Sequence, residues 1–157
     1  IYSHLGYNLK ITDMQAAVGL GQLTKLSEFI KIRQENFSYL KNELKKFEKY
    51  LVLPESTPKS NPSWFGFPIT VKESAPFSKN DLVNFLSSKL IDTRPLFAGN
   101  IIKQPYFKNI SYRIGGNLQN TDLIMNNTFW IGVFPGLNEK MLEYVIMSFK
   151  NFFNKHI

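Results

Sequence analysis

The stretch SWFGFPITV, residues 63–71, predicts a β-strand. Aromatic and β-branched residues fit the half-buried, pleated surface of a sheet. Pro68 lies inside this stretch and has no backbone N–H to donate to a neighbouring strand, so it favours an edge position or a β-bulge.

Downstream, the sequence predicts alternating helices and strands. Ser78 is a good N-cap for a helix. The expected elements are a helix at 79–90, a strand at 92–97, a helical turn at 121–127, a strand at 129–134 and a helix at 138–153. The segment between Ala98 and Leu118 contains several glycine and proline residues and is expected to be a loop. Long irregular segments often carry function.

Upstream, apolar residues from Thr12 onward recur mostly at intervals of three, four and seven, which predicts one amphipathic helix or two in series. Thr12 and Gln15 fit a capping box, so the helix is expected to start near Asp13. In a helix interior, Gly19 and Gly21 would each lower helix stability by roughly 1 kcal/mol relative to Ala. We therefore expect that they are present because the helix packs closely against another backbone. Residues 51–62, rich in proline, predict a connecting loop and a nearby domain boundary.

These elements predict an α/β fold, with a small, mainly antiparallel sheet covered by helices and preceded by a long helix. The chain has 157 residues, of which 43% are hydrophobic. This is enough for one sizeable core. We expect two parts, residues 1–50 and residues 51–157.

Residue types limit the chemistry of this chain. It has no cysteine, which excludes a disulfide or a thiolate metal site within it, and its two histidines, His4 and His156, lie near opposite ends. No phosphate-binding glycine motif is present. We therefore expect no catalytic residue and no metal site in this chain, and the residues alone indicate only an α/β domain.

The net charge of +7 raises the alternative of a basic interaction or nucleic-acid-binding module. The lysines are dispersed and interrupted by glutamates, which is more typical of a solvated helix face, so we expect no nucleic-acid partner. We also expect no membrane contact and a cytoplasmic location, because the sequence has no apolar run of bilayer length and no signal-peptide pattern.

Four blocks carry a resemblance to a known family. They are YSHLGYNLKITDMQAAVGLGQLTKL (2–26), PSWFGFPIT (62–70), RPLFAGNIIKQPYF (94–107) and NTDLIMNNTFWIGVFPGL (120–137). The first resembles the DegT/DnrJ/EryC1/StrS family of sugar aminotransferases. The other three are similar to its dehydrase branch, which acts on CDP-4-keto-6-deoxy-D-glucose.

The resemblance implies a fold-type I homodimer that uses pyridoxamine or pyridoxal 5′-phosphate and removes the C3 hydroxyl of a CDP-sugar in 3,6-dideoxyhexose and lipopolysaccharide biosynthesis. It also implies a two-iron two-sulfur cluster and a partner iron–sulfur flavin reductase. Residues 1–50 would be the end of the large cofactor domain with its connecting helix, and residues 51–157 the C-terminal small domain. The chain alone would be inactive, and an aminotransferase of the same family is the alternative.

The resemblance also assigns roles to individual residues. Asn8 would reach across the dimer to the cofactor phosphate, and Phe65 would lie beside the cofactor and sugar. The nucleotide sugar would contact Arg94, Asn100, Gln104 and Tyr106. The alternatives are a turn for Asn8, core packing for Phe65 and a solvated loop for the residues after 94.

Overall fold

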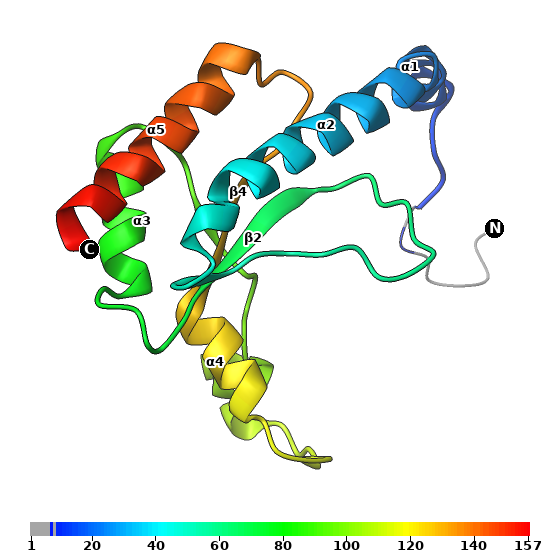
Figure 1. Ribbon diagram of the computed structural model, residues 1–157. Coiled ribbons are helices and arrows are strands. Elements are labelled where there is room, and N and C mark those ends of the chain that lie inside the picture. Colours follow the sequence, from blue (N-terminus) through cyan, green and yellow to red (C-terminus); the bar gives the residue numbers. More distant parts are fainter. Residues whose placement is uncertain (1–6, 8) are drawn as a thin grey trace.

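The computed structural model describes Tyr7 and residues 9–157 (Figure 1). Its α-helices are α1 (Asp13–Leu23), α2 (Leu26–Leu44), α3 (Lys79–Ser88), α4 (Gln119–Asn127) and α5 (Glu139–His156). Its strands are β1 (Leu51–Val52), β2 (Gly66–Val71), β3 (Arg94–Pro95) and β4 (Thr128–Gly132). Short 3₁₀-helices are η1 (Lys45–Phe47), η2 (Ile101–Lys103) and η3 (Pro105–Asn109).

The strands form one antiparallel sheet in the order β1-β2-β4-β3. The pairing of β2 with β4 runs from Gly66 opposite Gly132 to Thr70 opposite Thr128. Buried and partly exposed residues alternate along β2, as expected for a strand with one face in a core. The sheet therefore has a core face and a second face, which we call the open face.

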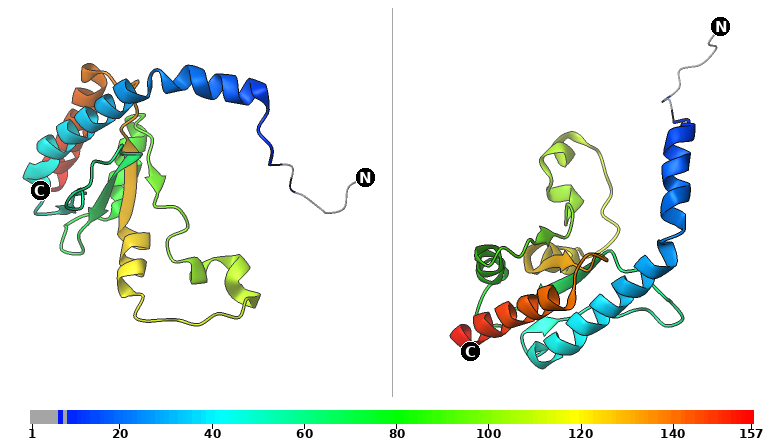
Figure 2. Two further views of the ribbon diagram at one scale, coloured as in Figure 1. Left: turned by 90° about the vertical axis from the view of Figure 1, so that its right-hand side faces the viewer. Right: turned by 90° about the horizontal axis from the view of Figure 1, so that it is seen from above.

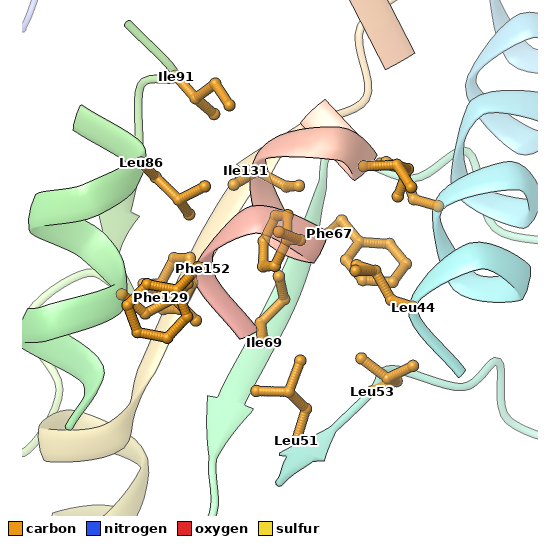
Figure 3. Packing of buried hydrophobic residues seen from close by; sticks show 14 of the residues in the cluster. Leu44, Leu51, Leu53, Phe67, Ile69, Leu86, Ile91, Phe129, Ile131 and Phe152 are labelled. Atoms are coloured by element: carbon orange, nitrogen blue, oxygen red, sulfur yellow. The ribbon is translucent and has the colours of Figure 1, made fainter. Parts of the chain in front are cut away.

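The core lies between the core face of the sheet and helices α2, α3 and α5 (Figures 2 and 3). Phe67 and Ile69 of β2 and Phe129 and Ile131 of β4 are each at most 2% exposed. The helices add the buried residues Phe37, Leu40 and Leu44 of α2, Leu82 and Leu86 of α3, and Leu142, Ile146, Phe149, Phe152 and Phe153 of α5. The second half of α2 thus shares a core with the segment after residue 50.

The predicted starts of α1 and α3 are confirmed, whereas α4 begins at Gln119 rather than at Thr121 and α5 at Glu139 rather than at Asn138. Thr12 caps α1 in a capping box with Gln15, and Ser78 caps α3 in a box with Asp81. Asn138 accepts a hydrogen bond from the Met141 N–H at the start of α5. Each cap provides an acceptor for a backbone N–H that has no partner within the helix.

Some predicted boundaries are wrong. Residues 51–62 are not all loop, because Leu51 and Val52 form β1 and Leu51 is buried against the core. The strand predicted at 92–97 is only β3, two residues long, and β2 begins at Gly66 rather than at Ser63. Short strands carry too little periodicity to be recognised from sequence.

Pro68 does not lie at the edge of the sheet as a whole, because β2 has neighbours on both sides. However, β1 pairs only with Thr70 and Val71. At Pro68 that side of β2 faces no residue of β1, so the proline occupies a local edge, where its missing N–H is tolerated.

The two predicted helices in series are present, but α1 does not pack as expected. It extends away from the sheet and from the other helices (Figure 2). None of its residues is buried, and a Cβ added at Gly19 or Gly21 would meet no described atom within 4 Å apart from its chain neighbours and the backbone of its own helix. The close backbone contact expected at these glycines is therefore not made within the described residues.

Among the described residues, the helices are too short or too polar to span a lipid bilayer.

We predict that Leu90→Gly stabilises the chain by roughly 0.5–1 kcal/mol, because a non-glycine residue in the left-handed region is strained. Leu90 follows α3 with φ of 58° and is 95% exposed, so its replacement removes little packing. Urea unfolding checks this against Lys89→Gly, since Lys89 has φ of −98° and no such strain. The Lys89 variant should be less stable than wild type, and a destabilised Leu90 variant would contradict the account.

Candidate functional site

A row of three side chains crosses the open face of the sheet. Pro68 of β2 and Arg94 of β3 are both cross-strand partners of Trp130 in β4. Directly opposed residues place their side chains on the same face. The register therefore brings a cation from the edge strand next to a large aromatic ring in the middle of the sheet.

Two glycines make room beside Trp130. Gly66 and Gly132 are cross-strand partners, so this part of the open face carries no side chain. A Cβ built on Gly66 would lie 2.5 Å from Cε3 of Trp130, which shows that the indole rests directly over the glycine. Phe65 is 68% exposed, and its ring centroid lies 5.1 Å from that of Trp130. The half-buried indole of Trp130 thus fills the space left by the glycines, and the exposed side chain of Phe65 lies beside it.

Arg94 lines a groove of about 800 Å³. The groove runs from the turn after α3 past β4 to the beginning of α5, and Leu90, Phe134 and Met141 contribute apolar surface to its lining. An Arg94 guanidinium nitrogen lies 2.9 Å from a carboxylate oxygen of Asp92, and both side chains are largely exposed. An exposed ion pair of this kind contributes little stability, so the guanidinium can exchange partners at low cost.

Residues 97–118 form a segment, here called the excursion, that projects from the sheet and includes η2 and η3 (Figure 2). Its base is held by Asn100, which is 2% exposed. The Asn100 side chain donates a hydrogen bond of 2.8 Å to Oδ1 of Asp122, and Lys103 Nζ lies 2.8 Å from the same oxygen. Gly99, with φ of 63°, sits against Met125, where a side chain would collide. The excursion is therefore anchored to α4.

The contacts of Asp122 also set its charge. The Lys103 ammonium, followed by the Asn100 amide, lowers the pKa of Asp122 below its ordinary value of 3.8. Both groups donate to the ionised carboxylate and so favour it over the protonated form. At neutral pH this anchor is an ionised carboxylate held by two donors.

Gln104 and Tyr106 occupy different parts of the excursion. The Gln104 amide donates to the Ala98 carbonyl oxygen at 2.7 Å, which closes a turn of the chain. Tyr106 is exposed, and its ring centroid lies 5.5 Å from that of Phe107. In the described structure Tyr106 is thus accessible, whereas the amides of Gln104 and Asn100 are engaged.

The structure gathers the predicted site residues into two groups. Phe65 and Arg94 flank Trp130 on the open face, while Asn100, Gln104 and Tyr106 belong to the excursion. Asn8 lies outside the described residues.

Sequence reasoning assigned no role to Trp130 or to Asp122. An aromatic residue between inward-facing Phe129 and Ile131 was the available signal for Trp130. Asp122 gave no signal, because its partners lie about twenty residues away in the chain.

The described residues contain no group of three or more His, Asp or Glu side chains placed to hold a metal ion. The Phe65 ring, tilted by 51° from the Trp130 indole, offers exposed apolar surface without an ionisable group. Such a surface fits the side of a planar cofactor ring and can neither donate nor accept a proton there.

Residues 1–150 match the DegT/DnrJ/EryC1/StrS aminotransferase family. Lipopolysaccharide biosynthesis protein RfbH of Salmonella typhimurium is 59% identical over 97% of this chain and 35% of its own length. The dTDP-4-dehydro-2,6-dideoxy-D-glucose 3-dehydratase of Saccharopolyspora spinosa is 47% identical over 98% of this chain and 33% of its own length. The chain therefore spans about a third of the length of these curated relatives.

Solved structures agree in fold. An E. coli GDP-4-keto-6-deoxy-D-mannose-3-dehydratase with bound hydrated PLP matches 91% of this chain and 36% of its own, with a TM-score of 0.81 and 30% identity. An aminotransferase from Psychrobacter cryohalolentis matches 98% of this chain and 42% of its own, with a TM-score of 0.87 at 18% identity, which is evidence for the fold alone. The predicted α/β class, a small antiparallel sheet covered by helices as in fold-type I PLP-dependent enzymes, is confirmed.

We predict that Gly66→Ala destabilises the chain by about 1–3 kcal/mol, because the new methyl group forces the Trp130 ring to move. Thermal unfolding measures the loss, and near-ultraviolet circular dichroism reports the indole environment. Gly132→Ala is the matched control on the facing strand, since its Cβ would lie 3.6 Å from Phe134, an ordinary contact. Equal stability of the Gly66 variant and wild type would show that the indole does not depend on this glycine.

We predict that Asp122→Asn destabilises the chain at pH 7 and that this difference shrinks in acid. The folded pKa of Asp122 is lowered, so its contribution is present above 3.8 and is lost as the pH falls through the lowered value. Urea unfolding of both proteins at pH 7 and near pH 3 checks this. Other carboxylates titrate in both proteins and cancel in the comparison. A difference independent of pH would contradict the assignment.

Proposed function

This chain belongs to the DegT/DnrJ/EryC1/StrS aminotransferase family, and from that premise we propose that it is part of a nucleotide-sugar 3-dehydratase. In this proposal the enzyme removes the C3 hydroxyl of CDP-4-keto-6-deoxy-D-glucose, a step toward 3,6-dideoxyhexoses of lipopolysaccharide. The described chain supplies binding surface, and the groups that carry out the chemistry lie in the remainder of the enzyme.

The ranking of the relatives by identity is the observation that carries the proposal. Proteins named as 3-dehydratases are 47%, 35% and 33% identical to this chain, whereas those named as a transaminase or a perosamine synthase are 26%, 25% and 22% identical. The name of the relative at 59% identity refers to lipopolysaccharide biosynthesis. These relatives are named for dTDP- and GDP-linked sugars. The identity of the nucleotide as CDP is therefore itself part of the proposal.

We assign contact with the nucleotide sugar to Arg94 first. Its side chain lines the groove, and in the part of the chain that the structure describes its guanidinium forms an exposed ion pair with Asp92. A guanidinium can donate two parallel hydrogen bonds to phosphate oxygens, which suits the diphosphate of a nucleotide sugar. Tyr106 is the accessible candidate on the excursion, while Asn100 and Gln104 are assigned positioning roles because their amides already hold the excursion.

We assign Phe65 to the cofactor side of the site and Asn8 to the cofactor phosphate of a second subunit. An exposed ring next to Trp130 fits apolar contact with a pyridine ring, and it withholds a proton donor from that position. Pyridoxamine phosphate, when bound, supplies the conjugated system that accepts electrons during loss of the C3 oxygen. The chain's own contribution is to orient the sugar and to shield one side of the site.

The same proposal includes a homodimer, a two-iron two-sulfur cluster and an iron–sulfur flavin reductase as the electron donor. This chain has no cysteine, so all cluster ligands would come from other residues of the enzyme. The two parts that we assign, residues 1–50 and 51–157, would be the end of the cofactor domain with its connecting helix and the small domain.

The alternative function is amino transfer by a PLP-dependent enzyme of the same family. The absorption spectrum of the full-length protein, purified without oxygen, supplied with pyridoxamine phosphate and recorded before and after borohydride, separates the two. Iron–sulfur absorption without a borohydride-reducible aldimine is the expected result. A reducible aldimine and no cluster would refute the dehydratase in favour of the aminotransferase.

In the full-length enzyme, we predict that Arg94→Ala raises KM for the nucleotide sugar about 10- to 100-fold and lowers kcat less, because a charge-assisted phosphate contact is worth roughly 1.5–3 kcal/mol. Steady-state kinetics with CDP-, dTDP- and GDP-linked 4-keto sugars measures this and also tests the nucleotide. Arg94→Lys should retain part of the binding. Lys108→Ala, an exposed cation on the excursion, is the matched control and should change KM little. An unchanged KM in Arg94→Ala would remove this residue from the site.

A further inference from the structure

Residues 61–65 lead into β2, and Phe65 is the last of them. They belong to no helix or strand, because β2 begins at Gly66. Strand β1 pairs only with Thr70 and Val71, so it gives this segment no strand partner. The backbone of the segment is therefore held by contacts other than strand pairing.

Helix α2, which runs alongside this segment (Figure 1), supplies such contacts. Arg33 Nη1 donates a hydrogen bond of 3.2 Å to the Trp64 carbonyl oxygen. Gln34 Nε2 donates to Asn61 Oδ1 at 2.7 Å and to the Pro62 carbonyl oxygen at 3.2 Å. Two neighbouring side chains of α2 thus hold the segment on either side of residue 63.

The same helix also packs an aromatic ring on the segment. Phe37 is buried and stacks on Trp64, with ring centroids 3.7 Å apart and ring planes 2° from parallel. Phe37 lies four residues after Arg33, so the two side chains share one face of α2. Stacked rings can slide over each other, whereas a hydrogen bond weakens steeply as its angle bends. The Arg33 bond therefore fixes an orientation that the stack leaves open.

The carbonyl that Arg33 holds belongs to the peptide bond between Trp64 and Phe65. A peptide group is planar, so fixing its oxygen also fixes the direction in which the chain enters Phe65. The Phe65 ring has few contacts of its own, since the residue is largely exposed and its ring is tilted by 51° from that of Trp130. The direction of this ring is thus set mainly by its backbone.

We propose that Arg33 is a positioning residue that holds the Phe65 ring against the cofactor, with Gln34 supporting the same segment. The proposal rests on the proposed function, which assigns Phe65 to the cofactor side of the site. In this role Arg33 acts through the peptide bond that follows Trp64 and does not touch the cofactor. Its loss releases the ring, whereas the diphosphate contact assigned to Arg94 is unaffected.

In the full-length enzyme, Arg33→Ala should raise the dissociation constant of pyridoxamine phosphate about three- to tenfold, because an ordered aromatic contact is lost. It should lower kcat about tenfold and change KM for the nucleotide sugar less than about twofold. Titration followed by cofactor absorbance and steady-state kinetics measure these values. Arg33→Lys keeps a donor for the same carbonyl and should restore most of both losses. Lys31→Ala is the matched control and should change neither, because Lys31 is a largely exposed cation of α2 that pairs with Glu35.

A double-mutant cycle separates positioning from a structural role. If Arg33 acts through Phe65, adding Arg33→Ala to Phe65→Ala should change cofactor binding less than about twofold, because the ring to be positioned is gone. Additive effects would overturn the proposal. Gln34→Ala, which removes the donor to Asn61 and Pro62, should show the same non-additivity with a smaller effect, and it carries the test if Arg33→Ala does not fold.

Phe65→Ala alone distinguishes this proposal from the proposed function. Weakened cofactor binding in Phe65→Ala with unchanged binding in Arg33→Ala would overturn the positioning role alone. Unchanged binding in Phe65→Ala would overturn both the assignment of Phe65 and the positioning role. The titration contains no sugar, so neither result depends on whether the enzyme is a dehydratase or an aminotransferase.

Discussion

The antiparallel pairing of β2 with β4 is the constraint on which the rest of the structure depends. Its register points Phe67, Ile69, Phe129 and Ile131 into the core and places Trp130 on the open face. Because side chains alternate with a period of two, a slip by one residue would exchange the two faces of a strand. The same hydrogen-bonded pairing therefore determines both the core under the helices and the surface that we assign to ligand binding.

On the open face, small and large residues complement each other. The facing pair Gly66 and Gly132 leaves a gap in which the indole of Trp130 rests, and Phe65 and Arg94 lie on either side of that ring. The excursion adds a second surface whose base is tied to α4 by charged and neutral donors on Asp122. Local packing thus holds the sheet surface, whereas ionised contacts hold the excursion.

Structural features that depend on local sequence patterns, such as helix starts, could be predicted from the sequence. Side-chain caps at Thr12 and Ser78 identified two helix starts, because a cap involves residues only three apart. Strand β1 was missed, since two residues carry no periodicity and are defined only by pairing with Thr70 and Val71. The role of Trp130 was also missed, because its neighbours on the open face, Pro68 and Arg94, come from other strands.

The central claim is that Arg94, beside Trp130 on the open face, contacts the nucleotide sugar. The most direct measurement is a crystal structure of the full-length enzyme with a CDP-linked 4-keto sugar bound. The account predicts a guanidinium nitrogen of Arg94 within about 3.2 Å of a diphosphate oxygen, the range of an N–H···O hydrogen bond. A nucleotide sugar bound elsewhere, with Arg94 still paired to Asp92 alone, would contradict it.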